Sequence, residues 1–241
     1  MILALLGIMT GITSGFFGIG GGTILVPLLL LYGFDMKTAV AVSIMQMVFS
    51  SIFGSFINSR KNKAIFKDGL VIGLGGFFGG ALSGFIVPNI DGIYLKYLFL
   101  LVLLFSIYRV ASTSTDHGKK VKYHNKSLLV VVGFFIGMIA MSIGVGGSLL
   151  LTPILVSFMY YNLKDAASLG LFFVIFSSIA GFLSLSLAGH MPYSEGLIVG
   201  IASLIGVYIG IKIKNVVNIK SYKKLTLSLY VLVLIILLTR I

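Results

Sequence analysis

The feature that most constrains this chain is a glycine–proline pattern that occurs twice. The first copy reads Gly-Ile-Gly-Gly-Gly over residues 18–22 and reaches Pro27, and the second reads Gly-Val-Gly-Gly-Ser over residues 144–148 and reaches Pro153. Aligned 126 positions apart, identical residues follow in the same order: Gly7, Gly11, Gly18, Gly20, Gly21 and Pro27 against Gly133, Gly137, Gly144, Gly146, Gly147 and Pro153. Chance similarity between apolar segments would not preserve this order, so the pattern predicts a duplicated fold.

The duplication continues downstream with a shift of one position. At a separation of 127, identical residues again face one another: Lys37, Ala39, Phe49, Ser50, Ser51, Ile52 and Gly54 against Lys164, Ala166, Phe176, Ser177, Ser178, Ile179 and Gly181. We therefore expect a first repeat over residues 1–111, a basic linker over 112–126, and a second repeat over 127–241.

Both units are too apolar for a soluble core. The chain is 58% hydrophobic and only 10% charged, against about 25% charged residues in soluble domains. Each unit has a glycine-broken apolar segment (2–32 and 128–160) followed by three apolar runs (38–57, 69–87 and 93–108; 166–188, 196–211 and 225–238). Most runs approach the ~17–25 residues that span a bilayer, the last of each unit being short. This organisation predicts an all-α polytopic membrane protein, and residues 1–6 read as its first membrane segment rather than a cleaved signal.

Basic residues set the expected orientation, because cytoplasmic loops of membrane proteins are enriched in Lys and Arg. Fifteen of the 18 basic residues fall on one side if the broken segments return to the side they came from. They are Arg60, Lys61, Lys63, Lys67, Arg109, Lys119, Lys120, Lys122, Lys126, Lys164, Lys212, Lys214, Lys220, Lys223 and Lys224, which leaves Lys37, Lys96 and Arg240 outside. The chain is then a multi-pass protein of the cell inner membrane, with both termini extracytoplasmic.

The same scheme inverts the second unit. The loop after the first long run is basic in one unit (60–67), whereas the equivalent loop in the other (189–194) contains no Lys or Arg. Three crossings plus a returning hairpin make an odd count, so the two units lie in opposite orientations. Inverted repeats of this kind are a recurrent plan of secondary transporters.

The glycine-broken hairpins are the first candidate site. Their arms are short for full spans, so the turns should lie at membrane depth, where irregular backbone must be buried in protein or line a cavity. Inverted hairpins would bring their tips together near the midplane, with helix N-termini and free N–H groups suited to a small anion. The alternative is that the glycines only permit tight hairpin packing. The candidate tip residues are Gly20, Gly21, Gly22, Thr23, Gly146, Gly147 and Ser148.

Polar residues in the first long run extend this candidate site. Ser43, Gln46 and Ser50 share one helical face, and a Gln buried in a membrane protein needs a partner or a polar cavity. Their counterparts in the second unit are Gly170, Phe173 and Ser177, so the predicted site is asymmetric and includes Gln46, Ser50 and Ser177. Interhelical hydrogen bonding is the alternative role, mainly for the serines. The Gly76-x3-Gly80-x3-Gly84 and Gly206-x3-Gly210 patterns are interpreted as packing seams instead.

Several functions are disfavoured. All six acidic residues lie in or beside predicted loops, which argues against a carboxylate proton relay or cation site. With no Cys, and with every His in a loop, no metal cluster, nucleophile–base pair or nucleotide loop is visible. We therefore expect no catalytic residues, no enzyme activity, no metal and no cofactor. The net charge of +12 is interpreted as cytoplasmic loops rather than a nucleic-acid-binding face.

These motifs resemble the sulfite exporter TauE/SafE family. A Gly-rich segment followed by Pro, present in both halves of a membrane protein of this length, is typical of that family, and here it is carried by residues 18–27 and 144–153. Ser148 stands where the second copy would have its third glycine. The resemblance implies transport of small sulfur-containing anions such as sulfite or sulfonates.

The expected function is secondary transport of a small anion, with a sulfur-containing one implied by the resemblance, by alternating access around a midplane site. The expected partners are that anion and the lipid bilayer. The competing interpretations are an anion channel and an integral membrane scaffold that transports nothing. The sequence assigns no oligomeric state, coupling ion or direction of transport.

Overall fold

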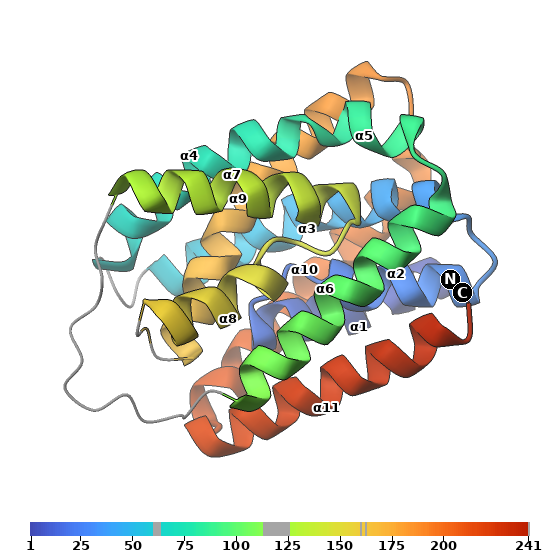
Figure 1. Ribbon diagram of the computed structural model, residues 1–241. Coiled ribbons are helices and arrows are strands. Elements are labelled where there is room, and N and C mark those ends of the chain that lie inside the picture. Colours follow the sequence, from blue (N-terminus) through green and yellow to red (C-terminus); the bar gives the residue numbers. More distant parts are fainter. Residues whose placement is uncertain (60–63, 113–125, 160, 162, 241) are drawn as a thin grey trace.

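Each glycine motif lies between two short helices, and three longer stretches of helix follow it. The computed structural model describes residues 1–59, 64–112, 126–159, 161 and 163–240, and all regular structure in this part of the chain is helical (Figure 1). The first half contains α1 (Ile2–Phe17), α2 (Gly22–Leu31), α3 (Met36–Ser59), α4 (Ala64–Ala81), α5 (Ser83–Asn89) and α6 (Gly92–Ser112). The second contains α7 (Lys126–Ser142), α8 (Ser148–Phe158), α9 (Leu163–Leu187), α10 (Tyr193–Val216) and α11 (Ile219–Leu238). The predicted basic linker 112–126 lies almost wholly outside the described residues.

Within the described part of the chain, six segments are long and apolar enough to cross a membrane: Met36–Ile57, Gly69–Asn89, Gly92–Ser112, Leu163–Leu187, Tyr193–Val216 and Ile219–Leu238. The expectation that the last run of each unit is short was wrong, because α6 has 21 residues and α11 has 20. Helix α11 begins early because the Asn218 side chain caps it, accepting a hydrogen bond from the Ser221 N–H at 2.8 Å. Lys220, Lys223 and Lys224 therefore belong to a helix rather than a loop.

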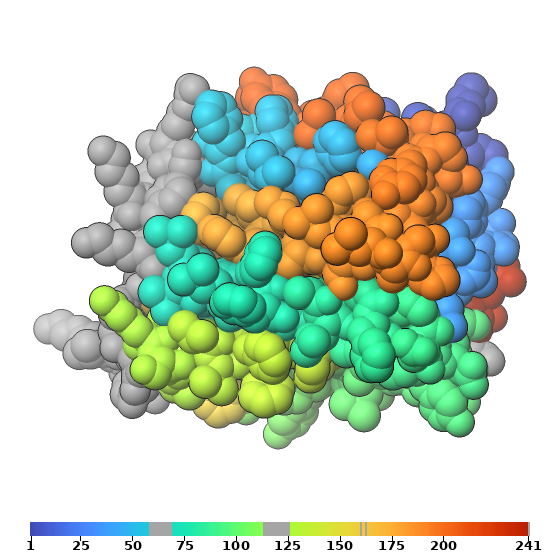
Figure 2. Space-filling view, turned by 90° about the horizontal axis from the view of Figure 1, so that it is seen from above, coloured from blue at the N-terminus to red at the C-terminus, as the bar shows by residue number. Residues whose placement is uncertain are grey.

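The helices form two layers. One is a row in which neighbours pack in the order α1, α10, α3, α9, α4, α7, and the other is a row in the order α2, α11, α6, α8. Figure 2 shows part of the first row from outside, with α3, α9, α4 and α7 side by side. The two halves contribute equivalent helices to each row: α1 corresponds to α7, α3 to α9, α4 to α10, α2 to α8, and α6 to α11. Replacing every helix by its equivalent in the other half gives the same row in reverse order. The first helix of each hairpin thus packs on a helix of the other half, α1 on α10 and α7 on α4.

Both hairpins return to the end of the molecule from which they start. In Figure 1, α1 leads away from the end at which Met1 lies and α2 returns to it, whereas α7 starts from the opposite end and α8 returns there. The two hairpins therefore enter from opposite ends and meet inside the molecule. Helices α3 and α9, which follow the hairpins, also run in opposite directions.

Glycines make the contacts between α1 and α10 and between α4 and α7 unusually close. A Cβ added at Gly7 would lie 2.6 Å from the Val199 carbonyl oxygen, and Gly11, Gly15, Gly206 and Gly210 face carbonyls across the same contact. Across the α4–α7 contact the equivalent residues are Gly75, Gly79, Gly133 and Gly137. Gly80 and Gly84 face the backbone of α9 in the same way. Apart from Gly76, which contacts the Phe173 ring, the expected packing seams are confirmed.

Gly79→Ala tests the α4–α7 seam. The new methyl would collide with the Phe134 carbonyl oxygen, and overpacking of this kind costs about 1–3 kcal/mol. We expect a lower unfolding temperature in detergent, although Gly→Ala in an open helix stabilises by up to about 1 kcal/mol. Leu74→Ala, at an exposed position of the same helix, is the control and should leave the seam intact. A rise in the unfolding temperature of Gly79→Ala would contradict close backbone packing.

Basic side chains cap the C-terminal ends of neighbouring helices. The Lys37 Nζ donates to the Pro88 carbonyl at 2.8 Å, and the Arg240 guanidinium donates to the Leu31 carbonyl at 2.9 Å. Lys96 donates to the Arg240 carbonyl just beyond α11. Cations are favourable where unpaired carbonyls end a helix. Local capping thus accounts for the three basic residues that the charge analysis leaves outside.

Candidate functional site

The tips of the two hairpins contact each other in the interior. The Thr23 hydroxyl donates to the Val145 carbonyl at 3.1 Å, and the Ser43 hydroxyl donates to the Gly144 carbonyl at 2.7 Å. A Cβ added at Gly146 would lie 2.7 Å from the Ile19 carbonyl oxygen. Two segments more than 120 positions apart in the sequence therefore form one continuous structure at the centre of the molecule.

The turns require glycine at most of their positions. Gly18, Gly20, Gly21, Gly144 and Gly146 have φ between 66° and 79°, a region that residues with a Cβ rarely adopt. Gly147 differs, because its φ of −55° is helical; its need for glycine comes from the Phe173 ring, which lies where a Cβ would be. Helices α2 and α8 begin at Gly22 and Ser148. The N–H groups of Ile24, Leu149 and Leu150 donate to carbonyls of the turns, so the helix-start N–H groups without a backbone acceptor are those of Gly22, Thr23 and Ser148.

The two tips have equivalent surroundings with different chemistry. At the first, the Gln46 amide lies over Gly21, its Oε1 2.6 Å and its Nε2 2.8 Å from an added Cβ. At the second, the residue equivalent to Gln46 is Phe173, and its ring lies over Gly147. The centre thus has a polar half, formed by Gly21 and Gln46, and an apolar half, formed by Gly147 and Phe173. The asymmetry predicted from the sequence is present in the contacts.

Polar atoms without a hydrogen-bond partner gather around these tips. Both amide atoms of Gln46 are fully buried and unpartnered, and the hydroxyl of Ser148 is in the same condition. Ser14, in the last turn of α1, and Thr152, one turn beyond Ser148 in α8, also have unpartnered hydroxyls. An unpaired buried polar group costs about 1–3 kcal/mol, so such a concentration calls for a functional explanation.

The ten predicted site residues occupy two levels. Gly20, Gly21, Gly22, Thr23, Gly146, Gly147 and Ser148 form the tips, with Gln46 against them. Ser50 and Ser177 lie about one turn further along α3 and α9, and their hydroxyls donate to Met47 and Phe173 carbonyls of their own helices, at 3.4 and 3.3 Å. All ten are buried, so any passage to the tips is closed in this conformation.

Comparison with known proteins gives the chain a family. The model of the sulfite exporter TauE/SafE family matches residues 3–237, nearly the whole length. The chain belongs to the TauE/SafE family. The predicted resemblance is therefore confirmed, and membership together with six apolar spans makes this a multi-pass membrane protein of a transporter family.

Similar members of the TauE/SafE family come from distant organisms. A probable membrane transporter protein of Methanocaldococcus jannaschii is 27% identical, with 92% of this chain and 89% of the relative covered. The probable membrane transporter protein YdhB of Bacillus subtilis is 24% identical, covering 89% of this chain and 90% of that protein. No solved structure matches.

One ionisable residue of this TauE/SafE protein was missed in the sequence. Lys214 was placed in a basic loop, but it lies within α10, is only 4% exposed, and donates from Nζ to the Ser168 hydroxyl at 2.9 Å. The signal was available, because Lys214 follows Gly206 and Gly210 at the same spacing of four and therefore shares their buried face. Thr152 could have been found the same way, four positions after Ser148.

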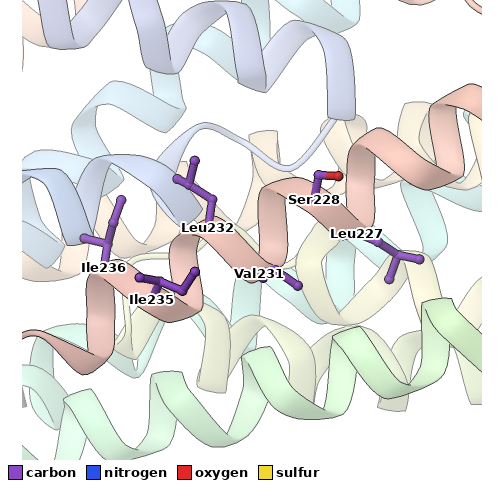
Figure 3. A pocket seen from close by; sticks show the side chains of 6 residues that line it. All are labelled: Leu227, Ser228, Val231, Leu232, Ile235 and Ile236. Carbon is purple, nitrogen blue, oxygen red and sulfur yellow. The ribbon is translucent and has the colours of Figure 1, made fainter.

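A larger hollow on this TauE/SafE protein does not suit a polar solute. It has a volume of about 660 Å³ and is lined by Leu227, Ser228, Val231, Leu232, Ile235 and Ile236. Figure 3 shows that all six come from α11. Five of these six side chains are aliphatic, and Val231, Leu232 and Ile235 are exposed, as expected for a helix surface that faces lipid. The hairpin tips therefore remain the candidate site.

Proposed function

We propose that this protein is a secondary transporter that moves a small anion, sulfite or a related sulfur-containing anion, by alternating access around the meeting point of the two hairpin tips. The anion would be held by the N–H groups at the start of α2 and α8, by Gln46 and by the Ser148 hydroxyl, and Thr23 would add a donor once its hydroxyl releases the Val145 carbonyl. These donors stabilise negative charge without titrating. Sulfite is named because the family model that matches the chain is that of a sulfite exporter.

The observation that carries this proposal is the state of Gln46. Its side chain is 0% exposed, and neither amide atom has a partner. A purely structural Gln would be expected to hydrogen-bond across the helices, as Ser43 does. The Gln46 amide instead lies against Gly21, beside the free N–H groups of a helix N-terminus. An anion bound between them would supply the missing acceptor.

Closure of the site favours a carrier over a channel. The predicted binding residues are all buried between the two layers, so helices must move before a solute can enter. The reciprocal packing of the two halves, with hairpins from opposite ends, supports an inverted duplication in which the two halves could exchange conformations.

The orientation can be tested by cysteine labelling, since the chain has no Cys of its own. Asp91 is exposed just before α6, and Lys220 is exposed in the first turn of α11. We expect a membrane-impermeant maleimide to label Asp91→Cys from outside intact cells and to label Lys220→Cys only after the cells are opened. Labelling of Lys220→Cys in intact cells would reverse the proposed topology.

Counterflow in proteoliposomes tests the function. Vesicles loaded with sulfite, sulfoacetate, thiosulfate or sulfate are diluted into the radiolabelled anion, and a carrier should accumulate label transiently because loaded anion exchanges with it. A channel would show flux without this dependence on the opposite side, and a scaffold would show none. Accumulation with none of the four anions would overturn the sulfur-anion proposal.

A further inference from the structure

A small polar pocket lies at the end of the molecule where α3 begins and α5 and α9 end. It has a volume of about 60 Å³ and is lined by Lys37, Thr38, Val87, Pro88, Leu185 and His190. One bound water needs roughly 10–15 Å³ of such a cavity, so the pocket has room for a small ion with little accompanying water. Val87 and Leu185 are buried and form its floor, whereas His190 is exposed at its mouth.

The polar groups of this pocket can bind a negatively charged ligand. The Lys37 ammonium uses one of its three N–H donors for the Pro88 carbonyl, at 2.8 Å, which leaves two for a ligand. The His190 ring adds a further N–H donor, whereas the Thr38 hydroxyl already donates to the Asp35 carboxylate. One acid is close, because Asp35 accepts a hydrogen bond from the Thr38 N–H at 3.1 Å.

Asp35 is engaged by the backbone rather than by the lysine. Burial raises its pKa, but hydrogen bonds from Thr38 and from backbone N–H groups at the start of α3 outweigh burial and hold the pKa below its ordinary value. The carboxylate is therefore ionised and balances the partial positive charge of the α3 N-terminus. It is not among the residues that line the pocket.

The pocket is connected to the hairpin tips by a single helix. From Thr38 to Gln46 is eight residues of α3, or about 12 Å along the helix axis. Between them, Val40 contacts Gly144, and Ser43 bonds to the Gly144 carbonyl. Helix α3 is thus the element that the pocket and the proposed central site share.

We propose that Lys37 and His190 form a second binding site, for one small oxyanion, in the pocket beside Thr38 at the start of α3, from which the anion passes to the hairpin tips. The anion is held there by the Lys37 charge and by an N–H of the His190 ring before it enters the centre, or after it leaves. The position of this site along the transport route rests on the proposed function, whereas the binding of an anion in the pocket does not.

The test measures the local electrostatic potential and its response to anions without any transport. Thr38→Cys is introduced into the cysteine-free chain, and the purified protein is treated with methanethiosulfonate reagents, the anionic sulfonatoethyl and the cationic trimethylammonioethyl. We expect the anionic reagent to react faster. Adding Lys37→Gln should lower the ratio of the two rates roughly tenfold, since one charge within about 5 Å acts oppositely on the two reagents.

Lys96→Gln is the matched control, because Lys96 also donates to a carbonyl at a helix end but does not line the pocket. It should leave the ratio unchanged. Sulfate or sulfite should slow modification of Thr38→Cys more than gluconate at the same ionic strength, and Lys37→Gln should remove that protection. His190→Cys provides a second reporter in case Thr38→Cys does not fold.

Equal rate ratios in the Lys37→Gln and Lys96→Gln backgrounds would overturn the site, as would equal modification in sulfate, sulfite and gluconate. Either result would leave the central site untested rather than refuted, because counterflow is measured separately. Conversely, protection in a protein that shows no counterflow would support the pocket and refute the proposed function.

Discussion

Gly21→Val and Gly147→Val are expected to abolish counterflow while leaving membrane insertion largely intact. At Gly21 the valine must adopt a φ of 79°, which costs about 1–3 kcal/mol, and its Cβ would occupy the space of the Gln46 amide. At Gly147 the backbone is helical, so the damage there is steric, from the Phe173 ring. Transport is measured in proteoliposomes, and insertion by the amount of monodisperse protein extracted from membranes.

Two further variants separate strain from loss of the site. Gly33 has a φ of 96° but nothing within 4 Å of an added Cβ, so Gly33→Val introduces a similar backbone strain away from the tips and should retain transport. Combining Gly147→Val with Phe173→Ala removes the ring that the valine would meet and should restore part of the activity. Normal transport by both single variants would show that the hairpin tips are not the site.

The returning hairpins and the contact between their tips could be predicted from the sequence, because the glycine motifs mark where the helices break and the charge distribution fixes the side to which the chain returns. The glycines at 18–22 and 144–148 mark a break, short arms cannot span, and the distribution of Lys and Arg demands a return. The structure gives hairpins that do return (Figure 1) and tips joined by the Thr23 and Ser43 hydrogen bonds.

The choice of packing partners was not predictable in the same way. Nothing in the periodicity of α1 says that it packs on α10 of the other half rather than on its own neighbours. Spacings of four in Gly7, Gly11 and Gly15, and in Gly206 and Gly210, show that each helix has a face for close approach. They do not say which two faces meet, because any two such faces are compatible.

The sequence says least about binding residues where a side chain has a hydrogen-bond acceptor in its own helix. Ser50 and Ser177 were predicted to bind the anion, but their hydroxyls donate to carbonyls three or four residues earlier in their own helices. Serine can always make this bond inside a helix, so its presence on a polar face says little about a ligand. Gln46 has no such local bond, which makes it the more informative residue. Their roles in binding remain proposals.

Gln46→Leu is expected to weaken anion binding and stabilise the protein at the same time. Loss of a hydrogen bond to a charged ligand costs about 1.5–3 kcal/mol, or roughly 10- to 150-fold in affinity. In the ligand-free state, however, the leucine replaces two unpartnered buried atoms, and removing such a penalty is worth about 1–3 kcal/mol. Binding is measured with a radiolabelled anion that does not titrate, and stability by thermal unfolding without ligand.

A loss of anion affinity together with a gain in stability distinguishes a binding residue from a structural one. A Gln that served packing through hydrogen bonds would lose stability on conversion to Leu. Phe173→Leu, at the equivalent position of the apolar half, is the control, because it removes packing but no donor and should lower stability without a comparable loss of affinity. If Gln46→Leu binds the anion as tightly as the wild type, Gln46 is not part of the site.

Gln46→Glu should weaken binding further than Gln46→Leu, since a buried carboxylate over Gly21 would repel an anion at the tips. Its affinity should improve as the pH falls and the carboxyl group becomes neutral, whereas the wild type should bind a non-titrating anion with little pH dependence.

The wild-type measurement also tests Lys214, the ionisable group buried within α10. A steep pH dependence in the wild type that Lys214→Met abolishes would make that lysine, rather than neutral donors alone, part of anion binding.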